Sequence, residues 1–113
     1  MTTSSGGAFT GYTTDNVNGV IHQIKYTKTD FADGSTMTLT GENSGLAIWA
    51  QTGMNASTTF APRQATHTTA GVATTYDGTR AVLAPIAVGG ERLKIVVTSG
   101  GANKTGALDI WVG

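Results

Sequence analysis

The chain closes with the stretch ERLKIVVTSGGANKTGALDIWVG, which runs from Glu91 to Gly113. Apolar and polar residues alternate on both sides of its Gly-rich middle, and successive side chains of a β-strand point to opposite faces. The positions that share the apolar face are Leu93, Ile95 and Val97 before the glycines and Leu108, Ile110 and Val112 after them. Two such runs around a glycine turn are typical of a β-hairpin, and we expect this hairpin to belong to a compact all-β unit.

Two registers of this hairpin keep the apolar faces together. In the first, Lys94 lies opposite Trp111, and its ammonium group can contact the indole ring. In the second, which is shifted by two residues, Lys94 lies opposite Asp109 and Arg92 lies opposite Trp111. The sequence leaves both registers open.

Four further segments have the alternation or the β-branched content of strands. They are residues 20–28, 36–40, 46–51 and 81–88. Pro85 has no N–H to donate, so the last segment is expected at a sheet edge or broken at that residue. Residues 52–79 favour short edge strands joined by long connections, with a functional loop as the alternative.

About six strands with turns every 8–12 residues are typical of a sandwich or barrel. The 113 residues suffice for one domain with a core between two layers of sheet. We therefore predict an all-β fold, a single β-sandwich of the jelly-roll kind over residues 13–113. Residues 1–12 are predicted to form a flexible N-terminal arm, because residues 2–7 have no apolar side chain to bury.

The composition excludes several classes of function. Charged residues make up 12% of the chain and the formal net charge is zero, so the basic surface of a nucleic-acid-binding protein is missing. The chain has no cysteine, which excludes disulfides and thiolate sites. No apolar run reaches the ~18 residues of a membrane span, and the N-terminus lacks the features of a signal peptide. So few charges fit a surface that partners cover, or one that Thr, Ser, Asn and Gln solvate.

Catalytic and metal motifs are also missing from the sequence. His22 lies within a strand, where we expect it to be packed or paired across strands, and His67 lies in a polar stretch without a carboxylate. The segment from Asp30 to Gly34 lacks the alternating ligands of a calcium loop, and Asp-Gly turns explain it without a metal. The Gly-Gly pairs read as turns, because neither is followed by the Lys and the helix of a phosphate loop. We expect no enzyme, no metal and no cofactor.

Four aromatic residues are the candidate partner-binding residues: Phe9, Tyr12, Trp49 and Trp111. In simple alternation, Trp49 and Trp111 point away from the main apolar residues of their strands. A platform for sugars that uses Trp49, Trp111 or Tyr76 is one alternative. A second alternative is that both faces of these strands are covered.

Residues 89–113 resemble the C-terminal hairpin of small virion proteins of tailed bacteriophages, which decorate or cement a capsid shell. The shared pattern is a strand with Arg-x-Lys-x-x-Val, a turn with Gly-Gly-x-x-Lys-x-Gly, and a final strand. The resemblance implies a β-sandwich or jelly roll whose binding sites are extended surfaces. It carries over no catalytic residues.

The resemblance implies a structural protein of the virion, made in the host cytoplasm and located on the capsid surface. Its expected partner is the lattice of the major capsid protein, whose subunits it would bridge and stabilise while its N-terminal arm becomes ordered. A homo-oligomer, either a dimer or a trimer, is expected on the particle. A tail, fibre or neck component is the alternative within this class, and a carbohydrate-binding module is the alternative from another class.

Overall fold

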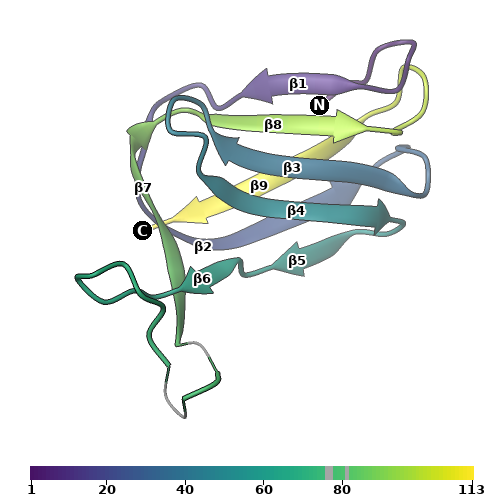
Figure 1. The fold of residues 1–113 in the computed structure, drawn as a ribbon. Coiled ribbons are helices and arrows are strands. Elements are labelled where there is room, and N and C mark those ends of the chain that lie inside the picture. The colour runs from purple at the N-terminus through teal and green to yellow at the C-terminus, as the bar shows by residue number, and fades with distance from the viewer. Residues whose placement is uncertain (76–77, 81) are drawn as a thin grey trace.

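The computed structural model describes residues 1–75, 78–80 and 82–113. These residues form strands and no helix (Figure 1). The strands are β1 (Phe9–Tyr12), β2 (Val17–Lys28), β3 (Ser35–Gly41), β4 (Ala47–Met54), β5 (Thr58–Phe60), β6 (Arg63–Ala65), β7 (Leu83–Glu91), β8 (Leu93–Thr98) and β9 (Gly106–Val112). They make two antiparallel sheets that pack together, which confirms the predicted all-β sandwich.

The second sheet is organised around its longest strand. The first sheet has the order β1-β8-β3-β4. In the second sheet, β9 pairs with β2 along one edge of β2. Along the other edge of β2, β7 pairs with the first half of the strand and β5 pairs with the second half. Strand β6 extends this sheet beyond β7. The nested pairs β1–β8 and β2–β7 follow the order of a jelly roll, whereas the β3–β4 hairpin and the position of β9 depart from it.

The two strands of the C-terminal stretch do not pair with each other, so the prediction of a hairpin is wrong. Strand β8 lies between β1 and β3, and Val97 is opposite both Phe9 and Met37. Because both edges of β8 are occupied, the chain crosses to the other sheet, where β9 pairs β2.

Neither predicted register of that hairpin occurs. Lys94 lies opposite Tyr12 of β1, and Trp111 lies opposite Gln23 of β2. Arg92 stacks on Tyr12 and not on Trp111, with its guanidinium carbon 4.7 Å from the ring centroid. The apolar alternation is the same for a hairpin and for two strands in separate sheets, so the pattern could not distinguish them.

The core lies between the two sheets. Its largest fully buried side chains are Tyr26, Phe31, Ile21, Ile24, Met37, Leu39, Ile86, Leu93 and Val97. The inward face predicted for β8 is confirmed by Leu93 and Val97. However, Ile95 of β8 is only half-buried, as are Leu108 and Ile110 of β9.

A bulge in the β3–β4 pair reverses the expected position of Trp49. Leu39 lies opposite Trp49 and Thr40 lies opposite Ala47, so Ile48 is an extra residue in β4. Such a residue disrupts the alternation, and Ile48 and Trp49 are both buried, with Trp49 only 9% exposed. The expectation of an outward-facing Trp49 is therefore wrong.

A second irregularity changes the faces of β2. Its register with β9 passes from Ile21 to Gln23, and Ile21 and Ile24 both lie in the core. His22 is exposed between them, so it is not packed in the core; its ring lies against Gly113 at the end of β9, as expected for a histidine that contacts a neighbouring strand.

Residues 1–12 lie against the sandwich, which corrects the prediction of a flexible arm. The last four of them form β1, which pairs β8. At the other end, the amine of Met1 donates a hydrogen bond to the carbonyl oxygen of Gly106 (2.9 Å), and the Gly106 N–H donates to the carbonyl oxygen of Met1 (3.0 Å).

Thr3 attaches this segment to the β8–β9 connection. Its hydroxyl donates to the carbonyl oxygen of Gly101 (2.6 Å) and accepts a hydrogen bond from the Lys104 N–H (2.9 Å). Its own N–H donates to the carbonyl oxygen of Lys104 (2.8 Å), and the residue is 3% exposed. Backbone groups and one hydroxyl hold this segment in place, so the lack of apolar side chains in residues 2–7 does not leave it flexible.

Between β6 and β7 the chain leaves the sandwich as a projecting loop, whose described residues are 66–75, 78–80 and 82 (Figure 1). Backbone hydrogen bonds join Thr66 to Val82 and to Thr74 at its base, each 2.8 Å long. The radius of gyration, 15.5 Å, exceeds the ~13 Å of a compact domain of this length, as expected for a loop that projects. Tyr76, Asp77 and residue 81, where one strand was predicted to begin, lie outside the described residues.

The sequence predictions for the segment around this loop hold. Strands β5 and β6 are the short strands expected within residues 52–79. Strand β7 pairs β6 as far as Pro85 and pairs β2 from Ile86 onward, so the ladder changes partner at the proline.

Candidate functional site

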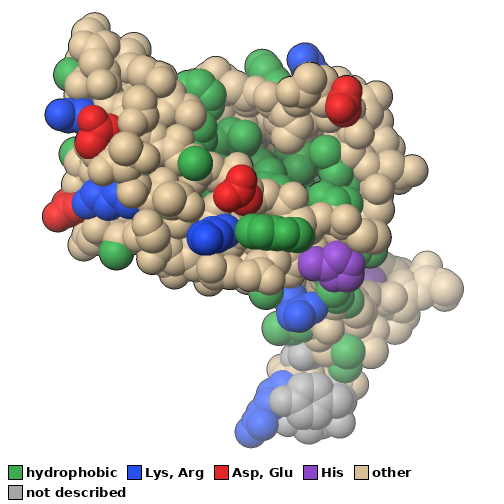
Figure 2. Space-filling view, turned by 180° about the vertical axis from the view of Figure 1, so that it is seen from behind, with side chains coloured by type: hydrophobic (Ala, Val, Ile, Leu, Met, Phe, Trp, Pro, Cys, Tyr) green, Lys and Arg blue, Asp and Glu red, His purple; other side chains and the backbone are tan. Residues whose placement is uncertain are grey.

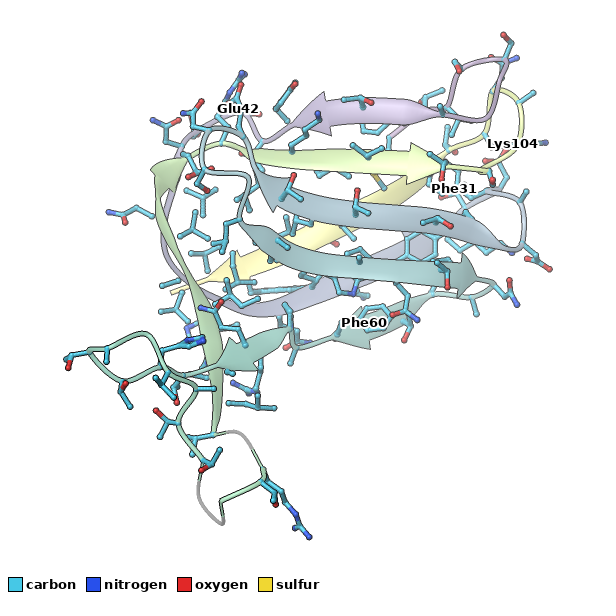
Figure 3. The ribbon with its side chains drawn as sticks, in the orientation of Figure 1. Phe31, Glu42, Phe60 and Lys104 are labelled. Atoms are coloured by element: carbon cyan, nitrogen blue, oxygen red, sulfur yellow. The ribbon has the colours of Figure 1, made fainter. Side chains whose placement is uncertain are left out.

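One long side of the sandwich is closed by aromatic packing. Strands β4 and β5 follow each other in the chain and lie at the same side of the two sheets. The Trp49 ring packs on the Phe60 ring with the centroids 5.0 Å apart, and Phe60 comes from β5 beside β4 (Figure 3). We call this side the closed seam.

The opposite side lacks such closure. Counted from the closed seam, one sheet has the order β5, β2, β9 and the other has the order β4, β3, β8, β1, so β1 has no counterpart in the first. The half-buried residues Phe9, Ile95, Leu108 and Ile110 line this side, which we call the open seam. Figure 2 shows hydrophobic side chains gathered on the face of the molecule that is seen from behind.

Two exposed aromatic residues flank one end of the open seam. Tyr12, the last residue of β1, is 44% exposed, and Trp111, near the end of β9, is 48% exposed. Phe9 packs along β1 over Gly11, where a Cβ atom would come within 2.5 Å of the Phe9 ring. The structure thus brings three of the four candidate residues to the open seam and places the fourth, Trp49, in the closed seam.

An ion pair holds Tyr12 at this end. The Nε of Arg92 donates to Oε2 of Glu42 (2.6 Å), and its Nη2 donates to Oε1. This hydrogen bonding lowers the pKa of Glu42 and raises the pKa of Arg92. Glu42 lies in the β3–β4 loop (Figure 3), and the guanidinium of Arg92 stacks on Tyr12. No local pattern in the sequence links residues so far apart, so sequence reasoning missed this group.

The neighbouring carboxylate, Glu91, fixes the same loop. It accepts hydrogen bonds from the N–H groups of Asn43 and Ser44 and from the Ser44 hydroxyl, each 3.1 Å long. The backbone hydrogen bond from Ser44 is the main cause of its lowered pKa. Gly41 is required beside it, because a Cβ atom there would overlap the carboxylate. Glu42 and Glu91 therefore have structural roles.

At the other end of the sandwich, Asp30 and Asp33 also act within the fold. Asp30 accepts hydrogen bonds from the N–H and the hydroxyl of Thr105, and the backbone bond lowers its pKa. Asp33 pairs with Lys28, which also donates to the carbonyl oxygen of Asn55 (3.0 Å). Two carboxylates of the segment weighed as a calcium loop thus contact separate partners.

The residues that the structure describes show no cluster of three or more His, Asp or Glu side chains that could hold a metal ion. They also enclose no pocket. His67 lies in the projecting loop, where it forms an isolated bridge with Ala73, far along the chain from the exposed His22. No helix in the described ranges could cross a membrane.

Among the residues that the structure describes, three buried side-chain polar atoms lack a hydrogen-bond partner: the hydroxyls of Tyr26 and Ser35 and the indole N–H of Trp49. Burial is the main cause of the raised pKa of Tyr26, with the charge of Asp33 second. An unsatisfied buried group of this kind costs about 1–3 kcal/mol. At Trp49, the packing of the ring on Phe60 and the core has to offset this cost.

Comparison of the chain with protein-family models, with curated proteins and with solved structures found no match. Function is therefore inferred from the chain and its structure alone.

Proposed function

We propose that this chain is a structural protein of a bacteriophage virion, which binds across subunits of the major capsid protein and stabilises the shell. One observation carries the proposal: the exposed residues Tyr12, Trp111 and Val112 lie on β1 and β9, which are edge strands of a β-sandwich. Such an edge offers backbone groups and side chains to an extended protein partner. Tyr12 and Trp111 at the open seam are side chains of the type that anchors protein interfaces.

A bridging protein needs two separate contact surfaces, and this molecule offers them. The first is the open seam. The second is the projecting loop with the adjoining start of β7, where Val72 is 62% and Leu83 is 59% exposed. The longest dimension of the molecule is 46 Å, so the two surfaces can reach different subunits. When one molecule contacts two subunits, the first contact raises the effective concentration for the second. Because such a molecule binds the assembled shell more tightly than the separated subunits, it stabilises the shell.

The experiment uses virions of the phage that encodes the chain. Antibody labelling locates the protein, which is then stripped from the particles and added back at low and at high salt before heating. We expect labelling of the capsid, rebinding at both salt concentrations because few charges lie at the contacts, and a higher rupture temperature with the protein present.

Two exposed substitutions sharpen this test. Val72→Asp places a charge on the projecting loop, and Ala102→Asp places the same charge on the β8–β9 connection, outside both proposed surfaces. Rebinding should be weakened by the first and unchanged by the second. Particles that rupture at the same temperature with and without the protein would refute a stabilising role.

The alternatives give different outcomes in the same experiment. Antibody labelling of the tail or neck would favour a component of those structures. Among the aromatic residues considered for sugar binding, Trp111 is the exposed one, Trp49 is buried and Tyr76 lies outside the described residues. Glycan binding that Trp111→Ala abolishes would therefore favour a carbohydrate-binding module.

A further inference from the structure

We propose that a second copy of this chain closes the open seam. In this dimer, β1 of each copy pairs with β9 of the other copy around a two-fold axis parallel to the strands. The proposal concerns the purified chain in solution and does not depend on the proposed function. Such a dimer covers the open seam, so a capsid subunit that binds at that seam has to displace the second copy.

The first support is the free edge of β9. Backbone groups of an antiparallel strand point alternately toward and away from the neighbouring strand. Gly113 exchanges both of its backbone hydrogen bonds with Val20 of β2, whereas Gly106 exchanges its bonds with Met1 on the other edge. Because the direction alternates from residue to residue between Gly106 and Gly113, the N–H and C=O groups of Leu108, Ile110 and Val112 point away from β2, toward the free edge. This edge is therefore already used for pairing at Met1 and is open beyond it.

The second support is the matching edge of β1. The Thr13 N–H donates to the carbonyl oxygen of Leu93 (2.9 Å), so the odd-numbered residues of this segment face β8. The backbone groups of Thr10 and Tyr12 then point away from β8, toward the open seam. Strand β1 thus offers two outward residues, and β9 offers three.

The two edges fit as a parallel pair. Strands β1 and β9 point the same way (Figure 1), and a two-fold axis parallel to the strands keeps that direction. In a parallel pair, a residue on one strand bonds the residues before and after the one opposite to it. Thr10 opposite Asp109 would bond Leu108 and Ile110, and Tyr12 opposite Trp111 would bond Ile110 and Val112. All five outward residues are then used.

The same register places like side chains together. Tyr12 and Trp111 are both on the outer faces of their sheets, so each Tyr12 lies beside Trp111 of the second copy as a cross-strand aromatic pair. On the inner side, Phe9 lies beside Leu108 and Ile110 of the second copy. The half-buried residues of both open seams become one continuous core.

The unequal sheets explain why a two-fold axis along the strands is required. One sheet extends one strand further than the other at the open seam, so its edge forms a step. Rotation by 180° about an axis parallel to the strands brings the longer sheet of each copy against the shorter sheet of the other, and both steps are filled. The contact is the same patch on both copies, which closes the assembly at two subunits.

Equilibrium sedimentation of the purified chain over a thousandfold range of concentration tests this dimer. Thr10 is exposed and is placed beside Asp109 of the second copy, so two substitutions of opposite charge should act in opposite directions. Thr10→Asp should raise the dimer dissociation constant by at least tenfold, because the repulsion occurs twice in each dimer. Thr10→Lys should lower that constant severalfold.

Trp111→Ala should raise the dissociation constant by at least tenfold, while Leu83→Ala, which removes an even more exposed apolar side chain outside the seam, should leave it unchanged. Circular dichroism of each variant monitors the fold. A chain that is monomeric at all concentrations, a trimer, or equal effects of the two Thr10 substitutions would overturn the proposal.

Discussion

Each seam of the sandwich has a tryptophan, which is buried at the closed seam and exposed at the open seam. At the closed seam, the short connection from β4 to β5 brings Phe60 onto Trp49, and the indole is buried. At the open seam, no segment in the described part of the chain covers β1 and β9 along their length, and nearly half of Trp111 is exposed. A tryptophan in a strand therefore belongs to the core or to the surface according to the face to which it points. The bulge at Ile48 turns Trp49 inward, where Phe60 covers it, whereas Trp111 follows the alternation of β9 and points outward.

The largest effect is expected at the closed seam. Trp49→Ala should lower the free energy of unfolding by about 3–5 kcal/mol, because it leaves a cavity against Phe60 and the core. Urea denaturation measures this change. Trp49→Phe is the matched control: it keeps an aromatic ring and removes the indole N–H that lacks a partner, so its cost should be much smaller. Equal costs for the two variants would mean that ring packing does not stabilise this seam.

The next effect concerns the end of the open seam that residues 1–3 occupy. Thr3→Val should cost about 1–3 kcal/mol, because the carbonyl of Gly101 and the N–H of Lys104 lose the hydroxyl that they contact. Thr3→Ser retains the hydroxyl and should cost less. If both variants unfold at the same urea concentration as the original chain, the N-terminal segment does not stabilise the sandwich.

A pH-dependent effect is expected where Glu91 binds the β3–β4 loop. Its pKa is lowered in the folded state from the ordinary 4.5, so its contribution to stability is fully present above that pH and is lost as the pH falls through the folded-state pKa. Glu91→Gln should therefore be less stable than the original chain at pH 7, and the difference should shrink toward pH 3. Thermal unfolding at several pH values measures it, and a difference that is constant with pH would contradict this role.

The smallest effect is expected for Trp111 in the monomer. Trp111→Ala should change the free energy of unfolding by no more than about 0.5 kcal/mol, as is usual for exposed positions. The measurement uses a concentration below that of self-association. A loss comparable to that of Trp49→Ala would show that the open seam is closed within the monomer.

The sequence predicted the strands better than their partners. The alternation around Leu93 and Val97 gave the inward face of β8 correctly, and Pro85 marked the point where β7 changes partner. The pairing of β8 and β9 was wrong because two consecutive alternating strands around glycines fit a hairpin and a crossing between sheets equally well. Only the occupied edges of β8 distinguish the two.

The candidate site was predicted in part. Trp111 is exposed, as the alternation of its strand predicts, whereas the bulge at Ile48 turned Trp49 inward, and a single extra residue leaves no mark in the composition of a strand. The attachment of residues 1–3 also escaped prediction, because it depends on backbone groups and on the hydroxyl of Thr3. Such contacts follow from the fold and not from local hydrophobicity.

The crossing of β8 and β9 to different sheets has a consequence for biosynthesis. Strand β8 is an inner strand of one sheet, and β9 supplies the longest partner of β2 in the other. As the ribosome releases the chain from its N-terminus, neither sheet can be completed until the last fifth of the chain has emerged. Strands β1 and β2 therefore have unpaired edges during translation, and pairing of these edges with neighbouring chains competes with folding.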